Sequence, residues 1–146
     1  MNKKLGTVGQ RPDPYKNFKF RIKWDGRYVA GMSRVSELRP ATKLKPIVLE
    51  SGMTQDPSFL SWANKVRPTG ERLDLQIAFR DLRTDLRIES MNEAGVLVAA
   101  WDVRRCRPSE FTALPELDAN ANAVPIEHLK LNHEGWVRDI SFIDPA

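Results

Sequence analysis

Residues 18–30, Phe-Lys-Phe-Arg-Ile-Lys-Trp-Asp-Gly-Arg-Tyr-Val-Ala, carry the clearest structural signal of the chain. Apolar and cationic side chains alternate up to Trp24. Because successive strand side chains point to opposite faces, this alternation predicts a strand with one aromatic and one cationic face. Asp25-Gly26 tolerates the positive φ angles of a tight hairpin turn, so residues 28–30 are the expected return strand. We expect the core face to hold Phe18, Phe20, Ile22 and Trp24, and the opposite face to hold Lys19, Arg21 and Lys23.

Further short strands and one helix follow from the same patterns along the chain. Asp56 can cap a helix over residues 56–66, whose first turn suits Pro57. Residues 33–46 and residues 107–123 are expected to be irregular, because prolines interrupt both. The remaining expected strands cover residues 47–50, 73–80, 86–91, 96–103 and 124–132. Since no strand–helix–strand alternation is present, the sequence predicts a mostly β fold, an antiparallel β-barrel or sandwich of six or seven strands with one flanking α-helix.

The composition is that of a single soluble domain. The 146 residues, 41% of them hydrophobic and 29% charged, can bury a core of their own. We expect a flexible or partner-ordered N-terminal arm at residues 1–12 and one domain over residues 13–146. No apolar run has membrane-spanning length and no signal-peptide core is present, so secretion by the general pathway is not expected. The single cysteine, Cys106, rules out an internal disulfide and is expected to be a small buried hydrophobe.

Charge is distributed unevenly along the chain. Residues 1–50 hold 12 Lys/Arg and 4 Asp/Glu, a net charge of +8, whereas residues 51–146 hold 11 and 15, a net charge of −4; the sum is +4. A basic half is compatible with nucleic-acid binding. It is equally compatible with self-association of a basic surface against an acidic one, or with a solvated face that has no partner.

Signals for catalysis or metal binding are absent from the sequence. His128 and His133 are the only histidines, and no Cys, Asp or Glu stands at a recognised ligand spacing from them. There is no glycine-rich phosphate loop, no nucleophile elbow and no Cys/His pairing suited to covalent catalysis. The sequence therefore indicates neither an enzyme nor a cofactor or metal site.

A single-stranded nucleic-acid-binding β-barrel is the alternative function. Basic residues interleave with Tyr15, Phe18, Phe20 and Trp24, and aromatic side chains can stack on bases. The alternation of the first strand places its aromatic side chains opposite its cations, however, which favours a core role for them.

Eight phrases of the sequence occur in a fixed order along the chain. They are Asp-Pro-Tyr-Lys-Asn-Phe-Lys-Phe (13–20), Trp-Asp-Gly (24–26), Val-Ala-Gly (29–31), Ile-Val-Leu-Glu-Ser-Gly-Met-Thr (47–54), Trp-Ala-Asn-Lys-Val (62–66), Asn-Glu-Ala-Gly (92–95), Leu-Pro-Glu-Leu-Asp-Ala-Asn-Ala-Asn-Ala-Val (114–124) and Glu-Gly-Trp (134–136). Taken together, these phrases resemble one family, the inner tail tube proteins of contractile phage tails and extracellular contractile injection systems. The resemblance runs from about residue 13 to residue 139, and the shared order of the phrases makes it specific.

The resemblance implies a small β-barrel with a flanking helix that assembles into hexameric rings. The rings would stack into a hollow tube inside a contractile sheath, and contraction would drive the tube through a target envelope. The implied partners are further copies of the chain, the sheath protein, the baseplate and other tube proteins, a full-length tube paralogue, and cargo held in the lumen. The particle would be assembled in the bacterial cytoplasm, without a catalytic step.

The sequence departs from the family pattern after residue 38. Tube subunits typically carry a long hairpin insertion at this point, whereas here residues 39–46 run almost directly into the next strand. The resemblance is thus to a variant lacking the usual hairpin, such as a subunit near the baseplate or a tube end. We expect subunit or ring contacts at Arg34, Arg39, Lys43 and Lys45, and a lumen or seam wall at Lys19, Arg21 and Lys23.

Overall fold

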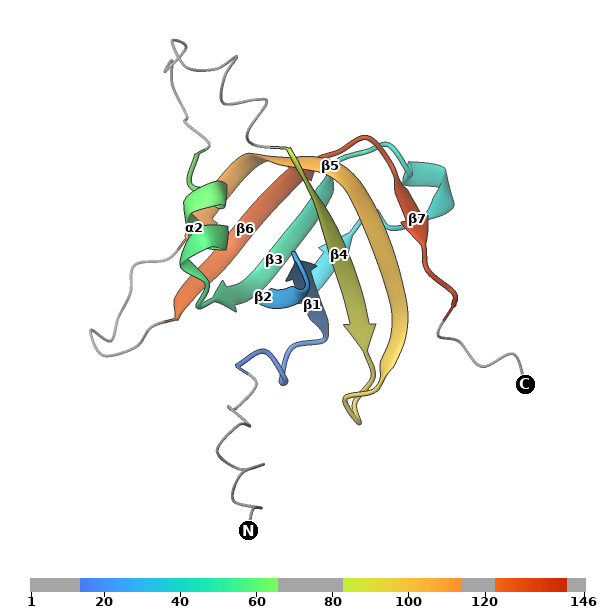
Figure 1. Ribbon diagram of the computed structural model, residues 1–146, viewed down its shortest axis with the longest axis horizontal. Helices are drawn as coiled ribbons and strands as arrows, with labels where there is room; N and C mark the ends of the chain where they lie inside the picture. Colours follow the sequence, from blue (N-terminus) through green and yellow to red (C-terminus); the bar gives the residue numbers. More distant parts are fainter. Residues whose placement is uncertain (1–13, 66–82, 114–122, 142–146) are drawn as a thin grey trace.

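The computed structural model describes residues 14–65, 83–113 and 123–141. The predicted N-terminal arm at residues 1–12 and the predicted strand at residues 73–80 lie outside these ranges. The described elements are β1 (Phe20–Trp24), β2 (Arg27–Ser36), the 3₁₀-helix η1 (Pro40–Thr42), β3 (Ile47–Thr54), α2 (Pro57–Ala63), β4 (Thr84–Met91), β5 (Leu97–Ala113), β6 (Val124–Asn132) and β7 (Trp136–Arg138) (Figure 1).

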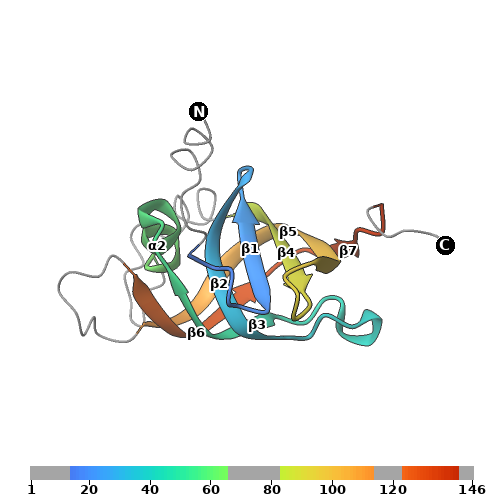
Figure 2. The same cartoon turned by 90° about the horizontal axis from the view of Figure 1, so that it is seen from below.

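The strands form a closed antiparallel barrel with one additional strand. The sheet order is β4-β1-β2-β3-β6-β5-β7, and a further pairing of β4 with β5 closes a ring of six strands. The mostly β, antiparallel fold with a flanking helix is therefore confirmed. In two perpendicular views, α2 and β7 lie at opposite ends of the barrel (Figure 2).

The first hairpin forms as the sequence predicts. Strand β1 pairs with β2, and Trp24 and Arg27 flank the two-residue turn. Asp25 and Gly26 have φ angles of 56° and 80°, and two consecutive positive φ angles are typical of the type I′ turn that suits twisted hairpins. Strand β2 continues to Ser36, beyond the predicted return strand. The prediction of irregular structure for residues 33–46 is therefore wrong for residues 33–36 and for the 3₁₀-turn η1.

Strand β5 changes partners partway along its length. Its first part pairs with β4, up to the Thr84–Cys106 pair, and its second part pairs with β6 from Arg107 onward. The bend occurs at Arg105, which has a φ of 47°. The predicted irregular segment at residues 107–123 is thus wrong for residues 107–113. Pro108 is accommodated at a register shift, where a strand tolerates proline.

Strand β7, which the sequence did not predict, prolongs β6 along the same edge of β5. Trp101 and Val103 pair with β7 on one edge and with β4 on the other. Between β6 and β7, Glu134 N–H donates to the carbonyl of Arg104 over 2.9 Å, and Arg104 N–H donates to that of Gly135 over 2.9 Å. Three residues are too few for a period-two pattern, so β7 depends on its place beside β5.

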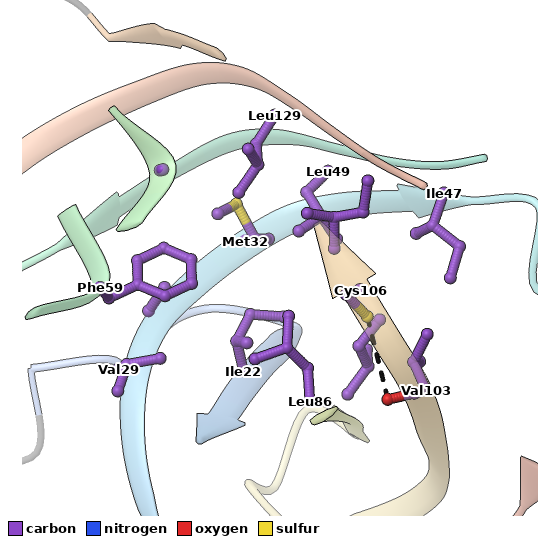
Figure 3. Packing of buried hydrophobic residues seen from close by; sticks show 14 of the residues in the cluster. Ile22, Val29, Met32, Ile47, Leu49, Phe59, Leu86, Val103, Cys106 and Leu129 are labelled. Atoms are coloured by element: carbon purple, nitrogen blue, oxygen red, sulfur yellow. Dashed lines mark hydrogen bonds between the residues drawn. The ribbon is translucent and has the colours of Figure 1, made fainter. Parts of the chain in front are cut away.

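The core fills the barrel between the strands and α2. Figure 3 shows Phe59 of α2 pointing toward Val29, Ile22 and Met32, while Cys106 lies across the cluster beside Val103 (Figure 3). Phe20 and Trp24 are partly buried against this core, as predicted for the aromatic face of the first strand, whereas Phe18, predicted on the same face, is not part of this cluster. Cys106 is fully buried, as predicted, and burial raises the pKa of its thiol.

Helix α2 begins where the sequence predicts and ends at Ala63. The predicted end, Val66, lies outside the described residues. Asp56 is the N-cap, and its Oδ1 accepts the N–H of Phe59 over 3.0 Å. Arg27 binds the same carboxylate, with Nε 2.8 Å from Oδ2. Burial alone would raise the pKa of Asp56, but the hydrogen bonds from Arg27 and Phe59 outweigh burial and lower it.

We expect Asp56→Ala to lower the free energy of unfolding by about 1–2 kcal/mol, because the cap and the Arg27 pair are lost together. The Asp56→Asn variant keeps a cap acceptor, so it should be affected less. Since folding lowers this pKa, the stabilisation by Asp56 is complete above about pH 4 and is lost as the pH falls through the lowered value. Urea titrations of the three proteins at pH 7 and pH 3 measure both effects. Equal pH sensitivity of the wild type and Asp56→Asn would contradict the assignment.

Candidate functional site

The three cations of the first strand and its lead-in, here called the β1 row, are Lys19, Arg21 and Lys23. They lie on the outer surface of the barrel and pack on aromatic rings. The guanidinium of Arg21 and the ammonium of Lys23 lie 5.6 Å and 5.3 Å from the ring centroid of Tyr28, and Lys19 lies 5.5 Å from that of Phe20. Cations at these distances are attracted to the ring face. The Tyr28 ring is therefore already occupied by cations of its own chain, which disfavours base stacking there.

Two of the aromatics considered for nucleic-acid binding, Tyr15 and Trp24, pack within the fold. Tyr15 is buried, its hydroxyl donates to the carbonyl of Val29 over 3.1 Å, and it accepts the N–H of Gln55 over 3.0 Å. Trp24 packs edge-on against Phe59, with ring centroids 6.1 Å apart. The alternative of an aromatic base-stacking platform on β1 finds no support in these contacts.

A charge cluster centred on Arg87 lies beside the β1 row. Arg87 binds Glu89 over 2.8 Å, Asp102 over 3.1 Å and Asp139 over 2.8 Å. Glu89 is only 3% exposed and also accepts a hydrogen bond from the Tyr28 hydroxyl. Burial would lower the pKa of Arg87, but its hydrogen bonds to the three carboxylates raise it. Arg87 thus joins β4, β5 and the segment after β7.

Asp139 fixes the chain after β7. Its N–H donates to the carbonyl of Ala100 over 2.9 Å. Hydrogen bonds from the backbone N–H and the hydroxyl of Ser141, followed by the bond from Arg87, lower the pKa of Asp139 to about 2. The carboxylate is therefore ionised at neutral pH and holds this segment against the barrel.

Arg34 and Arg39, which we expect to contact another subunit, each form an ion pair with a glutamate of their own chain. Arg34 lies 3.4 Å from Glu50, and Arg39 lies 3.5 Å from Glu37. Both arginines are largely exposed, and exposed pairs of this kind contribute little to stability. Both remain available at the surface for a partner.

Lys43 and Lys45 belong to a connection, residues 37–46, that packs on the end of β6 and the start of β7. The Lys43 ammonium lies 5.5 Å from the ring centroid of Trp136. His133 Nδ1 accepts the N–H of Gly135 over 2.9 Å, which leaves Nε2 to donate to the carbonyl of Lys45 over 2.7 Å. The connection therefore holds Leu44, 75% exposed, at the surface.

Exposed apolar side chains gather near β7. Val137 and Ile140 follow Trp136 in the sequence, and the Ile140 side chain is 66% exposed. Leu44 lies close to Gly135, just before β7. Among the described strands β7 is the last in the sheet order, so its outer edge pairs with no other described strand. Sequence reasoning missed this surface, because Val137 and Ile140 stand in a stretch without strand periodicity.

Neither a metal site nor a long apolar helix is found in the described parts of the chain. No group of three or more His, Cys, Asp or Glu side chains there could hold a metal ion. The helices that the structure describes include none of the length and apolar character needed to cross a membrane.

Comparison with known proteins gives one family match and several distant structural likenesses. The family described as T4-like virus tail tube protein gp19 matches residues 38–137, which is 100 of the 146 residues. No curated protein sequence matches the chain.

Three solved structures are distantly similar to this chain. A chain of the sheath–tube complex of an extracellular contractile injection system, PVC, is 15% identical, with 95% of this chain and 98% of that chain covered and a TM-score of 0.43. A chain of the PVC sheath/tube terminator is 16% identical, with coverages of 90% and 99% and a TM-score of 0.44. A chain of the anti-feeding prophage tube-terminating cap is 17% identical, with coverages of 89% and 92% and a TM-score of 0.42. At these TM-scores we base no conclusion on them.

Proposed function

This chain belongs to the family of T4-like virus tail tube protein gp19, and we propose that it is a structural subunit of the inner tube of a contractile injection system or phage tail. In this proposal the subunits form hexameric rings that stack into a hollow tube within a sheath. The tube delivers cargo through a target envelope, and the protein acts by assembly, without catalysis. The family match over residues 38–137 is the observation that carries the proposal.

The surface around β7 supports self-assembly. Its outer strand edge, which pairs with no other described strand, and the exposed side chains of Leu44, Val137 and Ile140 offer backbone groups and apolar area on one side of the barrel. Strand edges of this kind invite pairing with another chain unless they are covered. A neighbouring subunit that covers this surface would pair with the strand edge and bury the apolar side chains.

The cations of this subunit take two roles in the proposal. Arg34, Arg39, Lys43 and Lys45 face a neighbouring subunit or ring, while Lys19, Arg21 and Lys23 form part of a lumen or seam wall. Residues 37–46 pack back on the chain through Lys43 and His133, which supports a subunit whose contact is made by a compact surface instead of a long hairpin. The sheath, the baseplate, a full-length paralogue and lumenal cargo are the proposed partners, first in the bacterial cytoplasm and then in the particle.

The experiment that tests the function is the oligomeric state of the purified protein. We expect light scattering to give a mass near six subunits and negative-stain microscopy to show rings or stacked rings. A monomer at high concentration that binds single-stranded DNA, with affinity falling steeply as salt rises, would overturn the proposal in favour of the nucleic-acid module.

Charge reversal in the connection tests the proposed contacts. We expect the triple variant Arg39→Glu, Lys43→Glu, Lys45→Glu to assemble poorly at low ionic strength, because acidic surfaces of the neighbour would then be repelled. The matched control is Lys65→Glu, Arg104→Glu, Lys130→Glu, which makes the same charge change and also breaks one surface ion pair, since Lys130 lies 3.7 Å from Glu110. Circular dichroism establishes that both variants fold. Normal rings and stacks of the first variant at every salt concentration would show that these cations make no contact.

A further inference from the structure

A basic concavity, here called the Phe18 cup, lies between the segment that leads into β1 and the hairpin that joins β4 to β5. Its volume is about 830 Å³, and it is open to solvent. Phe18, Met91 and Val98 contribute apolar surface, and Lys16 and Lys19 line one side. Neither lysine forms an ion pair within the described residues, and Val98 is among the exposed large hydrophobics. Glu93 is the single carboxylate in the lining.

The walls of the cup are held in place before any partner binds. Met91 N–H donates to the carbonyl of Lys19 over 2.8 Å, which ties β4 to the lead-in of β1. The Asn92 side chain accepts the N–H groups of Ala94 and Val96 over 2.9 Å and 3.0 Å, which fixes the hairpin tip. A surface ordered in advance loses little conformational entropy on binding. The cup is thus shaped for an occupant that combines negative charge with apolar side chains.

We propose that the Phe18 cup binds residues 114–122 of a neighbouring copy of this chain. This segment, Leu-Pro-Glu-Leu-Asp-Ala-Asn-Ala-Asn, carries two carboxylates, two leucines and no cation. Its charge and apolar content complement the lysines and the apolar floor of the cup. Many carboxylates of the described residues are already paired, as Asp56 is with Arg27 and Glu134 is with Arg105. The inference rests on the proposed function, since it names one contact by which subunits join.

The position of the segment in the fold favours a neighbouring copy over the same chain. Residues 114–122 join Ala113, at the end of β5, to the start of β6, whereas the cup adjoins the start of β5 at Leu97. The 17 residues of β5 correspond to roughly 50 Å along the strand. A nine-residue segment anchored at both ends extends at most roughly 17 Å from its anchors. In Figure 1 the two ends of β5 lie on different sides of the barrel. Two different surfaces that meet between copies make a heterologous contact, which closes into rings or propagates as stacks.

Disulfide trapping between two single-cysteine chains tests the inference. Lys19→Cys and Asp118→Cys are made in separate full-length chains, mixed, assembled and oxidised. Cys106 is fully buried in both. We expect mixed disulfide dimers on a non-reducing gel, and their loss when Lys65→Cys replaces Lys19→Cys as the matched control. Rings seen by microscopy without a cross-link above this control would overturn the inference and leave the proposed function standing. Absence of any oligomer would overturn both.

Charge exchange provides a second readout that does not depend on cysteine. Lys16→Glu with Lys19→Glu should abolish assembly, and so should Glu116→Lys with Asp118→Lys, while the protein carrying all four substitutions should regain it. If each double variant folds but does not assemble, and the fourfold variant does not assemble either, a direct contact between these residues is contradicted. A Lys19→Cys, Asp118→Cys double variant that yields only internally cross-linked monomer would place the segment in its own cup and overturn the inference.

Discussion

Replacing Arg87 with leucine is expected to lower the free energy of unfolding by about 3–5 kcal/mol, the range measured when one partner of a buried ion pair is removed. Glu89 is almost fully buried, and Arg87 is its only ion-pair partner among the described residues. Without Arg87, the Glu89 carboxylate would stay buried with the Tyr28 hydroxyl as its one remaining side-chain partner among the described residues, or it would take up a proton. Asp102 and Asp139 would lose the same partner.

Urea denaturation at pH 7 measures this effect. Arg34→Leu is the matched control, because Arg34 also pairs with a glutamate across two strands but is 70% exposed, and it should cost less than about 1 kcal/mol. Adding Glu89→Gln to Arg87→Leu should restore part of the loss, since the buried charge is then gone. An Arg87→Leu protein as stable as Arg34→Leu would show that the cluster does not hold the outer face of the barrel together.

The first hairpin is the part of the fold that the sequence predicts best, because every interaction that defines it is local. Alternation assigns the two faces of β1, and Asp25-Gly26 supplies the positive φ angles of the turn. The cap of α2 is equally local, since Asp56 binds the N–H of a residue three positions on. These features need no knowledge of the remaining chain.

The surface features of the candidate site depend on contacts between residues distant in sequence. Tyr28 and Glu89 are 61 positions apart, and His133 reaches the carbonyl of Lys45 over 88 positions. The bend of β5 likewise arises where the strand leaves β4 for β6, so local patterns at residues 107–113 did not reveal it. The sequence indicated which residues are cationic, and the barrel determines which of them lie together on its surface.

The clustering of charge also changes how the basic half of the chain is understood. Arg27, Arg34 and Arg39 each pair with a carboxylate of their own chain, so these three cations are compensated locally. Lys16 and Lys19, beside the apolar floor of the Phe18 cup, form no such pair within the described residues. The net charge of a segment is thus a weaker guide to its partner than the charges that the fold leaves uncompensated.

Replacing Gly52 with alanine is expected to lower the free energy of unfolding by about 3 kcal/mol, the upper end of the usual cost of overpacking. A Cβ atom at Gly52 would lie 2.0 Å from the carbonyl oxygen of Gly31 and 2.5 Å from the Met32 sulfur. The oxygen belongs to the paired backbone of β2, so strands β2 and β3 would have to separate. Family membership does not explain this glycine, whereas the close approach of the two strands does.

Two other glycines provide the controls for this effect. At Gly31 a Cβ atom would meet the Phe18 ring at 2.5 Å. Since that side chain can turn away, Gly31→Ala should cost less than Gly52→Ala but should disturb the Phe18 cup. At Gly95 nothing lies within 4 Å and the φ is +81°, so Gly95→Ala should cost only the strain of a positive φ, about 1 kcal/mol. Urea midpoints of the three variants give the order directly. Equal losses at Gly52 and Gly95 would show that the close approach of β2 and β3 is relieved at little cost and does not require glycine at position 52.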